Sequence, residues 1–290
     1  MNLLIDGSSL LWRSYYTSDR DVDGVTKKFL SQVQLYASMY NSQDIYIAWD
    51  KKILRGKNFR QLSGEGEYKA QRDKSVAEKV YASQPIIHKI SHALGCRNLY
   101  PWTMEADDII SWLSTTLGGS SVVITTDGDM LQLINTTTCV YNPQKKLTID
   151  HNNFDTVMEM PIEHFLAYKA ILGDKSDNIE GIKGFGPVNS KILAKTWVEK
   201  TEPINEEMTA IIERNLQLMD LSIGYILAGE KELEAYNLQI TQYKDVKFDV
   251  DNFKVLCTEY KYYDMIEDIT LWKRAFEKSP LLQILEELPF

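Results

Sequence analysis

The sequence predicts an α/β protein in which a central, mostly parallel sheet is flanked by helices and followed by a C-terminal helical lobe. In the first half of the chain short apolar runs alternate with helical patterns, and residues 139–150 indicate a β-hairpin. From about residue 160 the patterns are mostly helical, over 161–172, 187–199 and 205–221, with weaker segments near 251–260 and 268–287. We therefore expect an α/β core over residues 1–160 and a helical lobe over residues 161–290.

Composition and length are those of an ordinary globular protein. The 290 residues are 44% hydrophobic and 25% charged, and no run approaches the ~18 apolar residues of a membrane span. A strand pattern begins at residues 3–5, where a signal peptide would need a basic start and an apolar stretch. Cys96, Cys139 and Cys257 stand far apart without CxxC pairing. We expect a cytoplasmic protein without membrane contact, whose thiols are reduced and buried.

The net charge of −9 speaks against a polyanionic partner, but its distribution matters more than its sum. Residues 51–74 hold eight basic residues against three acidic ones, a local balance of +5. The acidic residues gather elsewhere, in short motifs where bound divalent cations would cancel part of their charge. The negative total therefore does not exclude binding to DNA.

Three predicted strands each deliver carboxylates at their C-terminal ends. The aspartates that follow the runs 3–5, 45–49 and 122–126 are, in order, Asp6, Asp50, and Asp127 with Asp129. In open parallel sheets this edge is where ligands bind, because the loops leave a crevice there. A single aspartate at a strand end is usually a turn residue or a helix cap. Three such strand ends in one domain indicate a shared acidic site.

A fourth acidic group opens a predicted helix. The apolar residues from Ala106 to Leu117 recur at the spacing of one helix face, which places Glu105, Asp107 and Asp108 in or near the first turn. The helix dipole stabilises an acidic residue there by only ~0.3–1 kcal/mol. Three acids within four residues repel one another unless cations neutralise them. Favourable pairing with the dipole is the plain interpretation, and a metal site is the functional one.

The segment after the helix of 161–172 combines two acids with a glycine-rich turn. Asp174 and Asp177 lie three residues apart, which is weak evidence on its own because surface acids are common. The turn that follows opens an amphipathic helix and contains Gly181, Gly184 and Gly186. Backbone N–H groups at such a helix start can bind a phosphate, and Lys183, Lys191 and Lys195 add positive charge. A plain tight turn between two helices is the alternative.

Taken in order, these motifs resemble the 5′-nuclease superfamily, which contains flap endonucleases and the 5′-nuclease domain of bacterial DNA polymerase I. The resemblance spans roughly residues 2–200 and rests on YKxxR (68–72), EADD (105–108), TDGD (126–129) and GDxxDN (173–178). It implies a PIN-like core, an arch over about 51–85 and a DNA-binding helix–hairpin–helix motif over about 173–197. The length is similar to that of the stand-alone enzymes of bacteria and phages.

The resemblance also implies a role for each matching residue. Two divalent cations, Mg²⁺ with Mn²⁺ as a substitute, are expected on two sets of carboxylates. The first set is Asp6, Asp50, Glu105, Asp107 and Asp108, and the second is Asp127, Asp129, Asp174 and Asp177. Lys69 and Arg72 match the catalytic basic pair at the base of the arch. The expected contacts to the duplex backbone are Gly181, Lys183, Gly184, Gly186 and Lys191, with K⁺ as a further candidate ion at this loop.

Two other candidate substrate contacts keep two interpretations each. Tyr68 either stacks on a base near the cut or packs beneath the arch. Arg13, on the first predicted helix, either contacts a phosphate or forms a surface salt bridge. The family pattern is also broken in two places. Residues 188–190, Val-Asn-Ser, replace the usual Lys and Thr, which predicts weaker anchorage of the duplex, and the short segment from Arg72 to about residue 84 predicts a small arch.

The chemistry expected of these residues is phosphodiester hydrolysis. Two metal ions ~3.5–4 Å apart can activate a water and stabilise both the attacking and the leaving oxygen. The resemblance implies a structure-dependent 5′-nuclease, acting as a 5′-3′ exonuclease and flap endonuclease in replication or repair. The expected partners are DNA with 5′ ends, flaps or nicks, and RNA–DNA hybrids. We expect a monomer in the bacterial cytoplasm, or in the host cytoplasm if a phage encodes it.

Two alternatives stay open. A PIN-type ribonuclease has a similar acidic cluster, although such domains are usually shorter and lack the hairpin loop and YKxxR. A non-catalytic DNA-binding scaffold would have lost metal ligands, whereas every expected carboxylate is present here.

Overall fold

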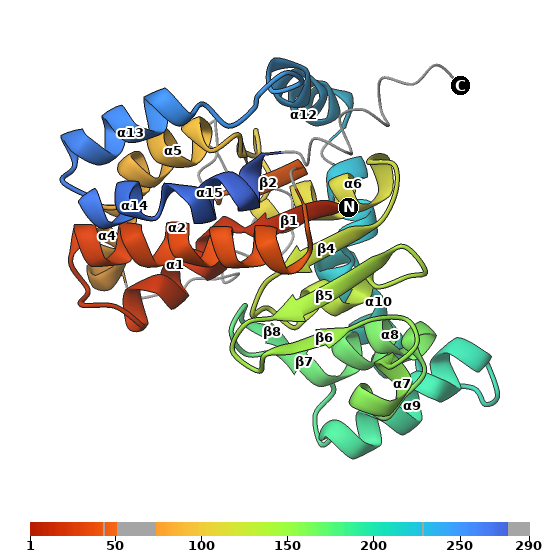
Figure 1. Ribbon diagram of the computed structural model, residues 1–290. Helices are drawn as coiled ribbons and strands as arrows, with labels where there is room; N and C mark the ends of the chain where they lie inside the picture. The colour runs from red at the N-terminus through yellow and green to blue at the C-terminus, as the bar shows by residue number, and fades with distance from the viewer. Residues whose placement is uncertain (43, 51–73, 228, 278–290) are drawn as a thin grey trace, which may run out of the picture.

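A six-stranded sheet runs through the molecule in the order β3-β2-β1-β4-β5-β6 (Figure 1). The computed structural model describes residues 1–277 except 43, 51–73 and 228. The strands are β1 (Asn2–Asp6), β2 (Asp44–Ala48), β3 (Arg97–Leu99), β4 (Ser121–Ile124), β5 (Thr138–Asn142) and β6 (Leu147–Ile149). All neighbours pair in parallel except β5 and β6, which form the predicted hairpin. Because β1 lies between β2 and β4, the three strands that lead to aspartates end side by side.

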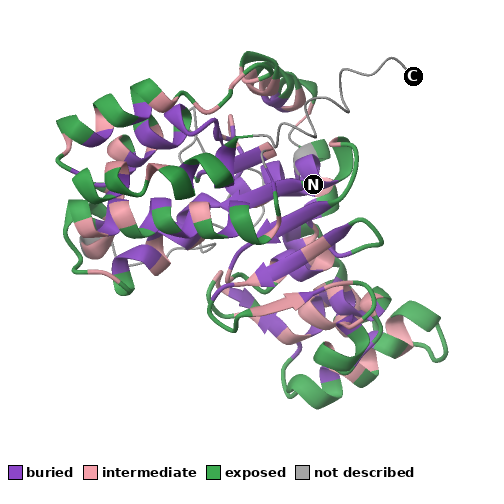
Figure 2. Cartoon of the chain, in the orientation of Figure 1, coloured by how far each residue is buried: buried purple, intermediate pink, exposed green. Residues whose placement is uncertain are grey.

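The residues of β1 show why this sheet is an internal layer. All five are buried, and their side chains alternate between the two faces as a period of two requires. Leu3 and Ile5 pack in one buried cluster with Ile47 of β2, whereas Leu4 packs with Tyr46 in a second cluster on the opposite face. Figure 2 shows the result, with buried strands between helices whose outer surfaces are exposed.

One face of the sheet is covered by helices from both ends of the chain. They are α1 (Gly7–Tyr16), α2 (Val22–Met39), α4 (Lys74–Tyr81), α5 (Gln84–Ala93), α13 (Val250–Glu259), α14 (Tyr263–Glu267) and α15 (Ile269–Phe276). Phe253 and Trp272 share a buried cluster with Leu3 and Ile5, and α15 lies beside α2 (Figure 1). The expected division of the chain at residue 160 stays a prediction, but these last helices pack on the α/β core.

The opposite face carries α6 (Ala106–Thr116), the short helix η1 (Asp129–Leu133), α7 (Phe154–Met158), α11 (Leu221–Leu227) and α12 (Glu230–Gln242). Ile109 of α6 and Tyr236 of α12 belong to the buried cluster that contains Leu4. The start of α6 is thereby fixed near the C-terminal ends of β1 and β2.

The remaining elements form a small lobe, at the lower right of Figure 1. It consists of α8 (Ile162–Leu172), the antiparallel pair β7 (Gly173–Asp174) and β8 (Ile179–Glu180), α9 (Pro187–Glu199) and α10 (Glu206–Met219). Ile171, Ile182, Ala194 and Ile212 are central to its apolar core. The helices predicted over 161–172, 187–199 and 205–221 are confirmed.

Three features differ from or extend the sequence predictions. Asp174 lies on β7 and Asp177 lies in the turn between β7 and β8, rather than at a plain helix end, because Gly173 turns the chain out of α8 with φ 76°. The helix predicted over 268–287 ends at Phe276, and residues 278–290 lie outside the described part. Helix α12 was not predicted, although Leu233, Tyr236 and Ile240 recur at helical spacing and pack against the cluster that contains Leu4.

Two expectations drawn from composition can be compared with the structure. In the part of the chain that the structure covers, no helix has the length and apolar character required to cross a bilayer. The three cysteines are free, with Cys96 and Cys257 buried and Cys139 half-buried. Burial raises the pKa of the Cys96 thiol to about 12, so this group stays protonated at neutral pH.

Candidate active site

Asp6 joins the ends of two neighbouring strands. It is 5% exposed, and its Oδ1 caps α1 by accepting a hydrogen bond of 2.9 Å from the Ser9 N–H. Its Oδ2 accepts a hydrogen bond of 2.8 Å from the hydroxyl of Thr125, directly after β4. The geometry of a parallel sheet thus places this carboxylate at the C-terminal edge, as predicted.

The electrostatic surroundings of Asp6 disfavour its charged form. Burial, followed by the negative charge of Asp50, raises its pKa to about 7, and Asp127 adds to the effect. The hydrogen bonds from Ser9 and Thr125 act in the opposite direction but are outweighed. A cation at this edge would therefore stabilise the carboxylate form of Asp6.

Asp50 connects the end of β2 to the start of α6. Its Oδ1 accepts a hydrogen bond of 3.2 Å from the N–H of Ala106, the first residue of α6. Glu105, which precedes this residue, is 8% exposed, and Asp107, which follows it, is half-buried. The acids of α6 therefore stand next to Asp50 at the same edge as Asp6.

Asp108 is fully buried and closes the first turn of its own helix. Its Oδ2 accepts a hydrogen bond of 3.1 Å from the N–H of Glu105, as in a capping box. The contact gives Asp108 a structural role at the start of α6. Its assignment as a metal ligand stays a prediction.

The second group of acids surrounds a lysine that sequence reasoning missed. The Nζ of Lys169, on α8, lies 2.8 Å from Oδ1 of Asp129 and 3.0 Å from Oδ2 of Asp174. The N–H of Asp129 donates to Asp127, and the N–H of Asp177 donates to Asp174, so all four predicted ligands of the second ion adjoin this ion-pair cluster. The only signal in the sequence is that Lys169 is the single lysine or arginine of the helix 162–172.

The pKa values in this cluster reflect the lysine. Burial and the charges of Asp127 and Asp174 raise the pKa of Asp129, although Lys169 opposes them. Burial alone would also raise the pKa of Asp174, but hydrogen bonds from Ser176 and the ion pair with Lys169 hold it below its usual value. For Lys169 itself burial is outweighed by the two carboxylates, which raise its pKa.

The donor chemistry of the edge fits divalent cations, although the present side-chain positions do not form a ligand shell. Among residues 1–277 without the three gaps, no three His, Cys, Asp or Glu side chains form a group that could hold a metal ion. The carboxylates accept hydrogen bonds from nearby donors or pair with Lys169 instead. Hard divalent cations prefer such oxygen donors, and their charge would relieve the repulsion at Asp6 and Asp129. Because Mg²⁺ keeps several of its waters, one or two of these carboxylates would be enough to bind it directly.

The glycine-rich loop forms a tight turn between α8 and α9. The N–H of Phe185 donates to the carbonyl of Ile182 at 3.1 Å, and Gly184 between them has φ 87°, which glycine adopts without strain. At Gly181 a Cβ would lie 2.2 Å from the carbonyl oxygen of Leu172, so no side chain fits there. Gly186 is the N-cap of α9. The turn leaves Lys183, Gly184 and Gly186 exposed, as a phosphate-binding loop requires.

Two predicted substrate contacts are already engaged within the protein. The Nζ of Lys191 donates to the carbonyl of Met158 (2.8 Å) and to Oε2 of Glu159 (3.0 Å). The Nε of Arg13 donates to Oε1 of Gln32 on α2 (3.1 Å), which ties α1 to α2. These contacts use two of the three N–H donors of Lys191 and only the Nε of the Arg13 guanidinium.

Three further predicted residues, Tyr68, Lys69 and Arg72, lie outside the described residues, together with most of the expected arch.

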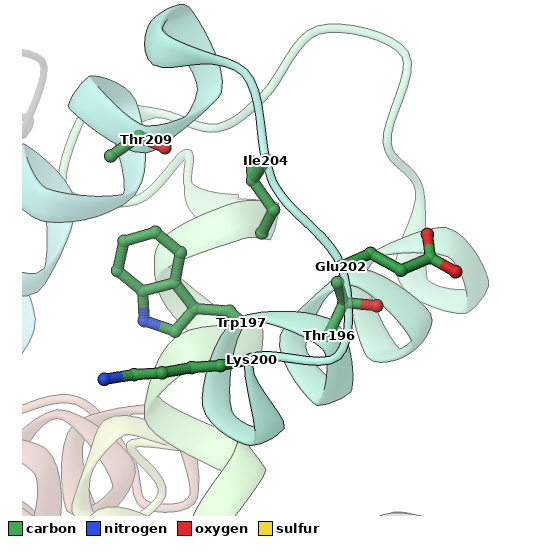
Figure 3. Close-up of a pocket in the computed structure, with 6 residues that line it drawn as sticks. All are labelled: Thr196, Trp197, Lys200, Glu202, Ile204 and Thr209. Atoms are coloured by element: carbon green, nitrogen blue, oxygen red, sulfur yellow. The ribbon is translucent and has the colours of Figure 1, made fainter.

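A shallow hollow of about 270 Å³ lies elsewhere, at the end of α9 (Figure 3). It is lined by Thr196, Trp197, Lys200, Glu202, Ile204 and Thr209. It contains none of the predicted metal ligands, so it is separate from the edge of the sheet at which the carboxylates gather.

Comparison with known proteins identifies the family of the chain. The model of a family described as 5′-3′ exonuclease, N-terminal resolvase-like domain, matches residues 1–159. A 5′-3′ exonuclease of Buchnera aphidicola subsp. Schizaphis graminum is 27% identical, with 95% of this chain and 93% of that protein covered. DNA polymerase I of Caldicellulosiruptor bescii is 26% identical, with 99% of this chain but 32% of the polymerase covered.

Among solved structures, the T5 D15 protein co-crystallised with metal ions has a similar fold. Its TM-score is 0.71 at 20% sequence identity, with 84% of this chain and 99% of that chain covered. The predicted α/β fold, with a mostly parallel sheet and a C-terminal helical region, is thereby confirmed. Since the family model covers more than half of the 290 residues, the chain belongs to the 5′-3′ exonuclease family, as the resemblance to 5′-nucleases implied.

Proposed function

We propose that the chain hydrolyses phosphodiester bonds of DNA at or near free 5′ ends, as a 5′-3′ exonuclease and a structure-dependent flap endonuclease. The acidic edge carries the proposal. Carboxylates that follow β1, β2 and β4 meet those of α6 and β7 at one end of the sheet, and the last of them leads into the glycine-rich turn. The family membership and the relatives named 5′-3′ exonuclease and DNA polymerase I support the same function.

We assign two divalent cations to this edge, Mg²⁺ with Mn²⁺ as a substitute. The first would be held by Asp6, Asp50, Glu105, Asp107 and Asp108, and the second by Asp127, Asp129, Asp174 and Asp177. The structural neighbour T5 D15 flap endonuclease was crystallised with DNA and metal ions, which supports this class of cofactor. When bound, such cations supply an activated water and neutralise charge on the reacting oxygens.

The substrate contacts follow from the same assignment. Lys69 and Arg72 would neutralise charge on the scissile phosphate, a contribution whose loss typically costs about 10²–10³ in rate. Tyr68 would stack on an unpaired base, and the guanidinium of Arg13, whose Nε donates to Gln32, would bind a phosphate. The turn with Gly181, Lys183, Gly184, Gly186 and Lys191 would hold the duplex backbone through exposed N–H groups and lysines. A K⁺ ion at this loop is part of the same proposal.

The proposed substrates are DNA with 5′ ends, flaps or nicks, and RNA–DNA hybrids, in replication or repair. We propose that the protein acts as a monomer in the cytoplasm of a bacterium or of a phage host.

The test compares a labelled 5′-flap duplex with the matching 3′-flap duplex and with a structured RNA of similar length. With Mg²⁺ the protein should cut the 5′ flap near the junction and leave the 3′ flap intact, and EDTA should abolish the cut. Preferential cleavage of the RNA would favour a PIN-type ribonuclease, and EDTA-insensitive binding without cleavage would favour a scaffold. Either result, or inactivity on all 5′-ended DNA with Mg²⁺ and Mn²⁺, contradicts the proposal.

A further inference from the structure

Helix α12 contacts the segment that leads into α6, and a buried acidic residue makes the main contact. Glu232 is 1% exposed. Its Oε1 accepts a hydrogen bond of 2.7 Å from the N–H of Trp102. Its Oε2 accepts hydrogen bonds from the N–H of Thr103 (2.8 Å) and from the hydroxyl of the same residue (2.9 Å). A carboxylate buried so deeply costs free energy unless such bonds compensate, and here donors occupy both oxygens.

A second side chain of α12 completes the attachment. The Oε1 of Gln239 accepts from the N–H of Tyr100 at 2.8 Å, and its Nε2 donates to the carbonyl of the same residue at 2.8 Å. Because Pro101 has no N–H, Glu232 and Gln239 together bind every backbone N–H that residues 100–103 possess. We call these two side chains the α12 clamp.

The clamp is itself fixed to the core. The Nε of Arg97, on β3, donates to the carbonyl of Tyr243 at the end of α12 (3.2 Å). The rings of Tyr236 and of Trp112, on α6, lie 5.2 Å apart. The helix therefore holds the segment 100–103 against the same α6 whose first turn carries the acids.

The clamped segment ends two residues before the acidic edge. Thr103, bonded to Glu232, is followed by the buried Met104 and then by Glu105. The next N–H, that of Ala106, bonds to Asp50. A shift of the segment would therefore move the acids of α6 relative to Asp50 and Asp6.

We propose that Glu232 is a positioning residue for the nuclease reaction, and that it acts by fixing the backbone that presents Glu105 and Asp107. It does not touch substrate or metal. The inference rests on the proposed function for its effect on cleavage, but its effect on the backbone and on cation affinity can be measured separately. It also gives the region after residue 200 a role at the acidic edge.

The test uses the full chain with Glu232→Gln, which keeps the size but replaces one acceptor oxygen by a donor that faces a backbone N–H. Glu234→Gln, at an exposed position of the same helix, is the matched control. Three quantities are compared: hydrogen–deuterium exchange of residues 100–108, Mn²⁺ affinity by calorimetry, and single-turnover cleavage of a 5′ flap alongside DNA affinity.

For Glu232→Gln we expect faster exchange in residues 100–108, with Mn²⁺ affinity and cleavage at limiting metal each reduced by about 10–100-fold, as for other residues that orient metal ligands. DNA affinity should change less than twofold, and excess Mn²⁺ should restore much of the rate. The control should match the wild type in all three measurements. If Glu232 had a purely structural role, Glu232→Gln would lower the melting temperature, but the protein that remains folded would bind and require Mn²⁺ as the wild type does. That result would overturn the inference.

Two further outcomes are separable. If the wild type binds Mn²⁺ but cuts no DNA, the proposed function fails, while exchange and calorimetry still decide the clamp. If Glu232→Gln does not fold, Gln239→Leu takes its place with the same criteria. It removes the two bonds to Tyr100 and a longer one to the carbonyl of Ala235 on the same helix. Unchanged exchange and Mn²⁺ affinity in the variant that folds would refute the clamp.

Discussion

The two predicted ligand sets of the acidic edge differ in what their carboxylates contact. In the first set, Asp6 accepts hydrogen bonds from Ser9 and Thr125. In the second set, the ammonium group of Lys169 lies between Asp129 and Asp174. At Asp6, burial and the negative charge of Asp50 raise the pKa to about 7. At Asp129 and Asp174, the positive charge of Lys169 opposes such a rise. We therefore expect the two carboxylates paired with Lys169 to respond to divalent cations differently from Asp6.

We expect Asp129 and Asp174 to bind a divalent cation only when Lys169 moves aside. In the metal-free protein Lys169 neutralises these two acids, and once metal is bound its ammonium group would lie free near the substrate. Four predictions test this comparison.

Asp6→Asn should reduce single-turnover cleavage of a 5′ flap by at least about 10³-fold, since a metal ion contributes several kcal/mol to the stabilisation of the reacting charge. The substitution keeps the size, and the Thr125 hydroxyl can accept a hydrogen bond from the new amide group, so circular dichroism should show an unchanged fold. Asp155→Asn, on an exposed part of α7, is the control and should retain full activity. Equal activity of both variants would remove Asp6 from the site.

Lys169→Met should destabilise the metal-free protein by about 1–3 kcal/mol, because Asp129 and Asp174 lose the cation between them in a partly buried setting. Saturating Mn²⁺ should raise the melting temperature of the variant by more than that of the wild type, since the metal no longer competes with the lysine. Lys195→Met, at an exposed position of α9, serves as the control. An identical Mn²⁺ response in variant and wild type would mean that the lysine and the metal do not compete.

In EDTA, the pH dependence of stability should reveal the raised pKa of Asp6. The pKa of Asp6 is about 7 in the folded protein against an ordinary value of 3.8, so between these values the folded state binds more protons than the unfolded chain. Its contribution to the free energy of unfolding should therefore fall as the pH rises from about 4 to about 7. Urea titrations at several pH values should show this fall in the wild type and a smaller one in Asp6→Asn. A pH dependence that is the same in both proteins would contradict the assignment.

Lys183→Ala should have the smallest effect. Its side chain is exposed on the glycine-rich turn, so removal should weaken duplex binding modestly and lower the slope of log affinity against log salt by about 1. The cleavage rate at saturating DNA should stay the same. Lys191→Ala should change the slope less, because Lys191 already pairs with Glu159. A larger change of slope for Lys191→Ala than for Lys183→Ala would indicate that the duplex contacts α9 rather than the turn.

Much of the fold could be predicted from the sequence because its signals are local. The alternation in β1, the runs that become β2 and β4, and the apolar face of α6 each reflect burial by a regular period. The position of Asp6, Asp50 and Asp127 at one edge follows from parallel pairing alone. The hairpin β5–β6 was marked by its turn residues.

The missed parts depend on contacts between distant residues. Lys169 and Asp129 are 40 residues apart in the sequence, and Glu232 and Trp102 are 130 apart. Contacts between such distant residues produce no local sequence pattern. Helix α12 has a short apolar stripe of Leu233, Tyr236 and Ile240 that was overlooked, whereas the burial of Glu232 beside it has no local signal in the sequence. The contacts of Lys169 and of the α12 clamp could therefore be identified only from the folded structure.

The most direct test of the acidic edge is anomalous scattering from crystals soaked in Mn²⁺. We expect one ion among the carboxylates of Asp6, Asp50 and α6, and a second beside Asp129 and Asp174 with the Nζ of Lys169 displaced from both. Manganese found only at other surface sites, with Lys169 still paired to the two aspartates at saturating metal, would contradict the assignment of the metal sites.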